Sequence, residues 1–312
     1  FSLRDELVNG TYQHGSYHSF SIHDPKRRLI SAANFKDRIV HHALVSILEP
    51  EYEKLFLPNS FANRIGKGTH KALKTCSSMM RRFEYYLFMD VTQFFPSIDH
   101  QKLIELLVEV VNDEKTLQLC TTILKSGEKV LESEYDMVWF PGDDLFAINR
   151  RRGLPIGNMT SQFWANVYLN PLDHLLKTEI ISQAWLRYVD DIVVFSTSKK
   201  DLNCVREKTI DFLSDLRMTI HEGSAQPTPT SQGLTFLGFR LFPDYIRLKR
   251  KKLVNGYRKL KGSYQRLREN RCTQDHYTNQ LKGWLSHVRQ GNTWQLRRTV
   301  LQKLGISATQ GE

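Results

Sequence analysis

Two adjacent aspartates, Asp190 and Asp191, lie between two short apolar runs of sequence. Trp185–Tyr188 precedes them and Ile192–Thr197 follows, and both runs have the aromatic and β-branched composition of buried strands. Because burying a charge costs free energy unless a partner compensates it, carboxylates at the tip of an apolar hairpin indicate a bound cation. Hard oxygen ligands at a strand turn suit Mg²⁺. A simple polar turn is the weaker interpretation, since both flanks are apolar.

A third aspartate, Asp90, has a similarly apolar setting in Phe83–Val91, which is predicted to be a buried strand. An acid within one strand and an acid pair on a neighbouring hairpin match the needs of a two-metal phosphoryl-transfer site. One metal lowers the pKa of the attacking hydroxyl, and the other holds the phosphates and the leaving group. We expect Asp90 and Asp190 to bridge both ions and Asp191 to support one. The predicted metal site comprises Asp90, Val91, Asp190 and Asp191.

Basic residues are concentrated in the last fifth of the chain. From Arg247 onward there are 16 Lys and Arg against 3 Asp and Glu, whereas the first 246 residues hold 28 against 30. A basic, largely helical tail is the surface expected for a polyphosphate partner. The charge alone is equally consistent with a solvated basic face.

Targeting and cysteine signals are few. No apolar run is long enough to cross a bilayer, and no signal peptide opens the chain, so we expect no membrane association. The four cysteines are scattered without paired metal spacing, which favours reduced structural thiols in a cytoplasmic protein.

Hydrophobic periodicity predicts a mixed α/β chain. The predicted strands are Ser19–His23, Phe83–Val91, Trp185–Tyr188, Ile192–Thr197, Met218–Ile220 and a hairpin of Thr235–Leu241 with Tyr245–Lys249. The predicted helices are Asp37–Glu49, His70–Arg82, Leu103–Leu124, Thr160–Ile180, Leu202–Arg217 and most of the chain after Lys249. Ser126–Arg152 is predicted to be irregular.

Several sequence motifs together resemble those of the reverse transcriptases. Tyr188–Asp191 matches their Tyr-x-Asp-Asp box, and Phe88–Phe95 matches their first acidic motif. Three further blocks occur in the same order, namely Phe35–Arg38, Phe61–Arg64 with Lys67–Thr69, and Thr235–Phe239. The combination is specific, although each motif alone is weak.

The resemblance spans nearly the whole chain and implies an α/β (α+β) right-hand polymerase. It places fingers at residues 1–82 and an antiparallel-sheet palm at 83–246, with an insertion at about 111–153. A basic helical thumb is expected at 247–312. Trp284 and Trp294 are expected in the small core of the thumb.

The family motifs also assign roles by position. Lys26 and Arg28 fall where the fingers grip the incoming triphosphate, which agrees with the need to neutralise developing phosphate charge. A basic turn in solvent is the alternative for this pair. Phe95 falls where an aromatic steric gate lies beneath the sugar, and core packing beside Phe94 is compatible with that role. The residues that resemble the primer grip are Phe236, Leu237 and Gly238, with a simple bulge at Gly238 as the alternative.

The block Leu154–Gln162 departs from most of the family. Most reverse transcriptases carry glutamine where this chain has Ile156, and an isoleucine side chain makes no hydrogen bond to a nucleotide. Losing such a contact weakens discrimination between well-seated and poorly seated base pairs. The block resembles that of diversity-generating retroelement enzymes, which copy a template RNA with errors opposite adenines. We assign Ile156, Gly157 and Gln162 to nucleotide binding, with simple packing of Ile156 as the alternative.

The resemblance further implies ligands and partners. These are two Mg²⁺ ions with Mn²⁺ as an alternative, deoxynucleoside triphosphates, template RNA, the RNA/cDNA duplex, and a small basic accessory protein, the accessory variability determinant. The cytoplasm of a bacterial, archaeal or phage-infected cell is the expected location. Predicted nucleic-acid contacts are Arg64, Lys67, Arg250, Lys251 and Arg258. Two alternatives stay open: an ordinary reverse transcriptase of an intron, antiviral-defence or CRISPR-linked system, and a non-catalytic RNA-binding scaffold.

Overall fold

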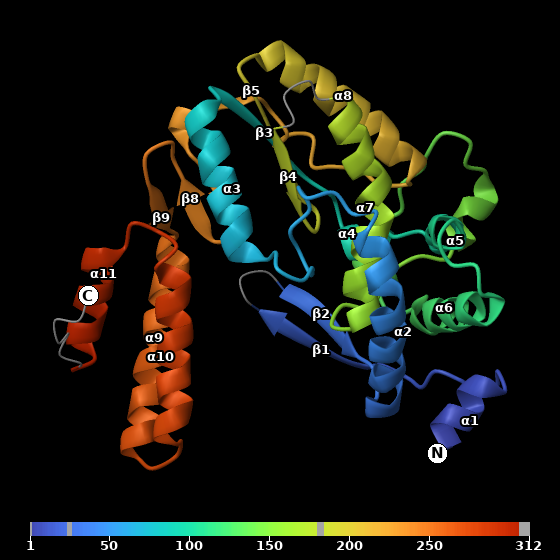
Figure 1. Cartoon of the computed structure of the whole chain (residues 1–312), viewed down its shortest axis with the longest axis horizontal. Coiled ribbons are helices and arrows are strands. Elements are labelled where there is room, and N and C mark those ends of the chain that lie inside the picture. Colours follow the sequence, from blue (N-terminus) through green and yellow to red (C-terminus); the bar gives the residue numbers. More distant parts are fainter. Residues whose placement is uncertain (1, 24–26, 180–183, 306–312) are drawn as a thin grey trace. The chain divides into compact units, whose positions relative to one another are not determined.

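The structure is a computed structural model that describes residues 2–23, 27–179 and 184–305 (Figure 1). The chain forms two compact units. Unit 1 comprises Phe1–Gly68, Leu87–Val194 and Lys199–Pro227, and unit 2 comprises Thr69–Tyr86, Phe195–Ser198 and Thr228–Glu312. The predicted fingers, palm and thumb boundaries follow a different division and stay predictions.

Unit 1 contains most of the helices in the first two thirds of the chain. Its helices are α1 (Ser2–Val8), α2 (Phe35–Glu53), α4 (Phe94–Ser97), α5 (His100–Val108), α6 (Glu114–Gly127), α7 (Met159–Glu179) and α8 (Lys199–Asp215). Helix α7 packs against α2, α5 and α8. Trp164, Tyr168 and Leu172 on α7 are fully buried, so this helix forms the centre of the apolar core.

Two sets of strands contribute to unit 1. Strands β1 (His18–His23) and β2 (Arg27–Ala32) form an antiparallel pair. Strands β4 (Trp185–Tyr188) and β5 (Asp191–Ser196) form a hairpin in which Tyr188 is opposite Asp191. The order of this sheet is β4-β5-β3-β6, in which β3 is Tyr85–Asp90 and β6, Thr228–Pro229, belongs to unit 2. The antiparallel hairpin with its tight turn is the one predicted from the apolar runs.

Unit 2 contains helix α3 (Thr69–Arg82), a three-stranded antiparallel sheet and the C-terminal helices. The sheet strands are β7 (Leu234–Phe236), β8 (Phe239–Leu241) and β9 (Ile246–Leu248), and the helices are α9 (Arg250–Arg268), α10 (Gln274–Val288) and α11 (Trp294–Lys303). Leu260, Val300 and Leu304 form a small core against which Trp284 packs. Trp294, expected in this core, is instead exposed.

The net charges of the two units differ more than those of the first 246 residues and the C-terminal tail. Unit 2 holds 21 Lys and Arg against 5 Asp and Glu, whereas unit 1 holds 23 against 28. The excess of basic residues therefore includes helix α3 as well as the C-terminal tail.

Three predicted elements differ from the structure. The single helix predicted at Leu103–Leu124 is two helices, α5 and α6, because Asp113 accepts a hydrogen bond from the Thr116 amide and starts a new helix. The first arm of the predicted C-terminal hairpin is itself a hairpin, β7–β8. The predicted strand Met218–Ile220 is reduced to one bridge between Val91 and Ile220. Within the described ranges, no helix is long and apolar enough to span a membrane.

Candidate active site

The turn between β4 and β5 carries the two adjacent aspartates. Val189, which precedes Asp190, has a φ of +57°, in the left-handed region that a β-branched residue rarely adopts. Such a conformation costs about 1–3 kcal/mol and persists only where surrounding contacts determine it. The position of Asp190 therefore depends on whatever fixes Val189.

A buried arginine fixes the conformation of this turn. Arg187, on β4, has a fully buried side chain that forms a two-pronged ion pair with Asp173 of α7, with N–O distances of 2.7 and 2.6 Å. One terminal nitrogen of Arg187 donates to the Val189 carbonyl at 2.9 Å. The remaining N–H groups reach Asn166 and Ser60, so all five guanidinium donors are used. The turn is thereby attached to the core helix α7.

The end of β3 brings Asp90 to the same turn. The Val91 amide lies 3.4 Å from the Asp190 carbonyl oxygen, and the His221 amide donates to the Asp90 carbonyl at 3.0 Å. Burial raises the pKa of Asp190, and the negative charge of Asp90 raises it further. The positive charges of Arg28 and Arg187 act in the opposite direction. Asp90, Asp190 and Arg28, which are distant in sequence, therefore share one electrostatic environment.

The donor set of this environment fits a hard divalent cation. Two neighbouring carboxylates repel each other unless a cation lies with them, and their oxygens are the ligands that Mg²⁺ prefers. Within the part of the chain that the structure describes, no group of three or more His, Cys, Asp or Glu side chains is arranged to hold a metal. The fit therefore rests on Asp90 and Asp190, and the metal contacts of Asp90, Val91, Asp190 and Asp191 all stay predictions.

A buried asparagine connects β2 to the block that contains Ile156. The Asn158 side chain accepts from the Ala33 amide at 3.0 Å and donates to the Ser31 and Pro155 carbonyls. The Ser31 amide also donates to the Ile156 carbonyl at 2.8 Å. Asn158 thus sets the spacing between the strand that carries Arg28 and the turn that carries Ile156. The sequence motifs assigned no role to Asn158.

The predicted steric-gate residue lies beside the same block. The Leu154 amide donates to the Phe95 carbonyl at 2.9 Å, which places Phe95 next to the segment leading to Ile156. The Phe95 ring is half-buried and packs edge-on against Phe94, with ring centroids 5.3 Å apart. Both the predicted gate and the predicted core packing are compatible with this placement.

Gly157 permits the close approach of the Ile156 turn to β2. Its φ is +115°, and a Cβ atom there would lie 3.0 Å from Cγ2 of Ile30. Ile156 is half-buried, whereas Gly157 and Gln162 are exposed. Arg28 is exposed on β2, opposite Ile22. Lys26 lies outside the described residues.

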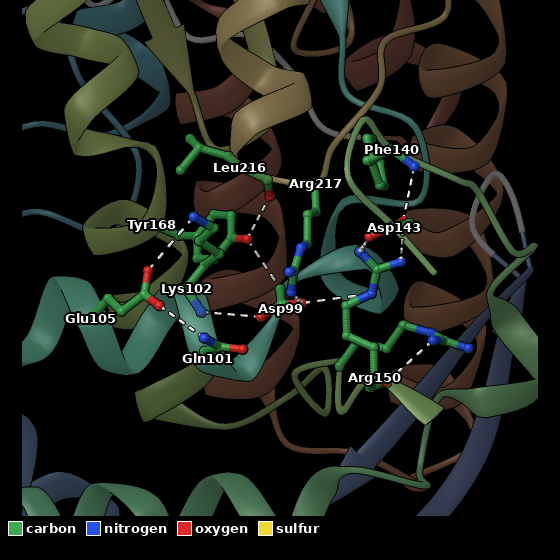
Figure 2. Close-up of polar contacts among 11 residues, drawn as sticks. Asp99, Gln101, Lys102, Glu105, Phe140, Asp143, Arg150, Tyr168, Leu216 and Arg217 are labelled. Carbon is green, nitrogen blue, oxygen red and sulfur yellow. Dashed lines mark hydrogen bonds and ion pairs between the residues drawn. The ribbon is translucent and has the colours of Figure 1, made fainter. Parts of the chain in front are cut away.

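A second polar network anchors the irregular segment that precedes this block (Figure 2). Buried Asp99 caps α5 through the Lys102 amide and accepts from Arg217 at 2.6 Å. Arg150 lies 3.9 Å from Asp99 and forms an ion pair with Asp143 at 2.8 Å. Figure 2 also shows the Tyr168 hydroxyl bridging the Asp99 amide and the Leu216 carbonyl. These contacts fasten the segment around Asp143 and Arg150 to the core.

The predicted primer-grip residues form a tight turn in unit 2. Leu237 and Gly238 have φ values of +47° and +88° and connect β7 to β8. Both positive angles are typical of a type I′ hairpin turn, which presents its backbone outward. The Phe236 side chain is buried, so any contact with a primer would come from the two turn residues.

The predicted nucleic-acid contacts have different surroundings. Arg250, Lys251 and Arg258 are exposed on α9. Lys67 donates to the Pro58 carbonyl at 2.7 Å and lies over the Phe61 ring. The Arg64 prediction is corrected: its side chain is 5% exposed, and its five N–H groups bind Glu53 and the carbonyls of Phe56, Leu57 and Ser60. Arg64 is a structural residue because no donor is left for a phosphate.

Comparisons with known proteins agree with this geometry. The family described as reverse transcriptase (RNA-dependent DNA polymerase) matches residues 22–241. Group II intron-encoded protein LtrA of Lactococcus lactis subsp. cremoris is 31% identical over 149 residues, which cover 47% of this chain and 22% of that protein. Protein YkfC of Escherichia coli (strain K12) is 22% identical over 295 residues, covering 81% and 74%.

Solved structures show the same fold. Apo telomerase from Candida tropicalis superimposes with a TM-score of 0.59 at 10% identity, covering 97% of this chain and 62% of that one. The likeness confirms the predicted α/β polymerase fold class. The chain spans only 15–22% of the length of several curated relatives that it matches.

The Arg187 network predicts that substitutions can restore the stability of the fold without restoring metal binding at the site. Arg187→Met leaves Asp173 buried without a partner and is expected to cost about 3–5 kcal/mol of unfolding free energy. Arg187→Met with Asp173→Leu replaces the pair by apolar groups and is expected to recover most of that loss. Because the Val189 carbonyl stays unpaired, Mn²⁺ affinity at Asp90 and Asp190 should not recover. Urea unfolding and electron paramagnetic resonance measure the two quantities, and recovery of both would contradict the positioning role.

The Arg28 charge predicts a directional change in the titration of Asp190. Arg28 favours the ionised carboxylate, so Arg28→Gln is expected to raise the pKa of Asp190 further above its ordinary value. Metal binding, which requires the carboxylate, should then be lost at a higher pH than in the unaltered chain. Carboxyl-carbon NMR of the metal-free chain follows this pKa directly. Arg27→Gln on the same strand is the control, since Arg27 pairs with Glu134; equal shifts would exclude a specific effect of Arg28.

Proposed function

Because the chain belongs to the reverse transcriptase family, we propose that it performs RNA-directed DNA synthesis at Asp90 and Asp190. The observation that carries the proposal is the backbone contact that brings the end of β3 to the β4–β5 turn, with the charges of Asp90 and Arg28 both acting on Asp190. Template RNA, the RNA/cDNA duplex and deoxynucleoside triphosphates are the proposed ligands.

Asp90 and Asp190 would hold the divalent cations, with Asp191 and the Val91 backbone as further contributors. Bound Mg²⁺ supplies the positive charge that activates a primer hydroxyl and stabilises the leaving pyrophosphate. The protein's own task is positioning: Arg187 keeps Asp190 at the turn, and the His221 amide holds the backbone of Asp90. Asp190 is half-buried, which limits solvent competition for its oxygens.

Residues of β2 and of the Ile156 turn would form the nucleotide pocket. Arg28 would supply positive charge toward the triphosphate, and the same role is proposed for Lys26. Phe95 would exclude a 2′-hydroxyl by collision with its ring. Asn158 supports this pocket by fixing β2 against the Ile156 turn, so Arg28 and Ile156 keep a constant spacing.

Asp190→Asn tests the polymerase proposal. Loss of one carboxylate should reduce primer extension on an RNA template by about 10³-fold or more, because its charge on the metals is removed. RNA binding measured without nucleotides should change little. Asp191→Asn and Asp90→Asn are the companion variants, and Asp136→Asn, in the irregular segment, is the control. Undiminished extension by Asp190→Asn would contradict the assignment, whereas a chain that binds RNA but never extends a primer would favour a scaffold.

We further propose that the cDNA carries errors opposite template adenines, as in diversity-generating retroelements. The support is Ile156, an apolar residue at the nucleotide pocket where a hydrogen-bonding glutamine is usual. A small basic accessory protein and a cytoplasmic location belong to the same proposal. An intron-type reverse transcriptase is the second candidate, favoured by the 31% identity to LtrA.

Ile156→Gln distinguishes these two candidates. Restoring a hydrogen-bonding side chain should lower misincorporation opposite adenine by about 10-fold, while errors opposite the other bases change little. Sequencing of cDNA made by the two chains gives the error spectrum. Ile156→Leu, which adds no polar group, should keep the adenine errors. Accurate copying of adenine by the unaltered chain would favour the intron-type candidate.

A further inference from the structure

A concave cationic surface lies on helix α3 in unit 2, and none of the proposed roles uses it. A pocket of about 340 Å³ is lined there by His70, Lys71, Leu73, Lys74, Ser77, Arg81, Ile246, Arg289 and Gln290. Four of these residues carry a permanent positive charge and none is an acid. We name this surface the α3 pocket.

Helix α3 divides into an apolar face and a cationic face. Leu73, Cys76 and Met80 are buried, whereas Lys71, Lys74 and Arg81 are exposed. Residues three, four or seven positions apart lie on the same side of a helix. From Lys71 to Arg81 the helix rises about 15 Å, at 1.5 Å per residue. Each strand of duplex DNA carries one charge per about 3.4 Å of helix axis, so on that scale this face is as long as a stretch of roughly four phosphates.

The opposite wall of the pocket is held rigidly. The Asn292 amide donates to the Ile246 carbonyl at 2.8 Å, and the Ile246 amide donates to the Asn292 side chain at 2.8 Å. These bonds fix the turn after α10 against β9. Arg289 and Gln290 lie in this turn, so their backbone is in place before any ligand arrives. A prearranged wall lowers the ordering cost of binding.

The cations of the α3 pocket have no acidic counterpart. Among residues 2–23, 27–179 and 184–305, no carboxylate forms an ion pair with Lys71, Lys74, Arg81 or Arg289. Arg150, Arg187 and Arg217, by contrast, are each paired with an aspartate. Burial, together with the charges of His70 and Lys252, lowers the pKa of nearby His287, which agrees with a positive local potential. Uncompensated like charges repel one another, so a polyanion is the ligand that this arrangement suits.

We propose that the α3 pocket binds the phosphodiester backbone of an RNA strand. It would act separately from the predicted contacts of Arg250, Lys251 and Arg258 on α9. The choice of RNA among polyanions rests on the proposed function, whereas the anionic character of the ligand follows from the pocket itself. The contact is to phosphates, so it gives affinity without reading base sequence.

The test compares two triple variants of the full chain that remove the same charge. Lys71→Gln, Lys74→Gln and Arg81→Gln alter the α3 pocket, and Lys125→Gln, Lys129→Gln and Lys177→Gln alter exposed residues of unit 1. Fluorescence anisotropy of a labelled single-stranded RNA is measured over a salt series, without nucleotides or divalent metal. The pocket variant is expected to raise Kd about tenfold or more and to reduce the slope of log Kd against log salt by about 2. The control variant should change both much less.

Two further measurements complete the test. Lys71→Arg, Lys74→Arg and Arg81→Lys keep the charge and should keep RNA affinity within about threefold. Titration with inorganic phosphate examines a free-anion site: phosphate binding that the pocket variant loses, with RNA affinity unchanged, would overturn the RNA proposal. Equal effects of the two glutamine variants would also overturn it. The binding measurements require no DNA synthesis, so the two proposals can fail separately. A chain that binds RNA through the pocket but makes no DNA would refute only the proposed function. A chain that makes DNA but binds RNA without the pocket would refute only the pocket proposal.

Discussion

The buried ion pair between Arg187 and Asp173 is the interaction on which the candidate active site depends. It has no solvent to screen it, and the desolvation of two charges is compensated only because all five arginine donors are satisfied. One of those donors holds the Val189 carbonyl, so the strained turn and Asp190 are fixed by the same arginine. The buried ion pair therefore fixes the position of Asp190, whose carboxylate is itself costly to remove from water.

Acidic and basic residues are distributed differently in the two units. In unit 1 three arginines that support the site are paired: Arg187 with Asp173, and Arg217 and Arg150 with Asp99 and Asp143. The Asp190 carboxylate is instead subject to the negative charge of Asp90, which suits a site that recruits a divalent cation. Unit 2 carries most of the basic excess, on α3 as well as on α9. The proposed metal site in one unit and the proposed phosphate-binding surfaces in the other are what a nucleic-acid polymerase requires.

The sequence predicted those elements around the candidate site whose signal is local. The β4–β5 hairpin followed from its two flanking apolar runs, and β3 followed from the apolar run that ends near Asp90. The metal roles of Asp90 and Asp190 stay predictions. The supporting residues were not recognisable, since Arg187 reaches Ser60, which is 127 residues away, and Asn158 reaches Ser31, at the same separation. Arg64 was misassigned because a basic residue in a turn does not reveal that Glu53 lies beside it. The break between α5 and α6 had a local signal, the Asp113 cap, that periodicity alone overlooked.

The central claim is that Asp90 and Asp190 share a divalent cation at a turn held by Arg187. Anomalous diffraction from crystals of the chain grown with Mn²⁺ would locate the ion without reference to any activity. The account predicts an anomalous peak in contact with carboxylate oxygens of both Asp90 and Asp190. Mn²⁺ bound only elsewhere, with these two carboxylates pointing apart, would contradict it.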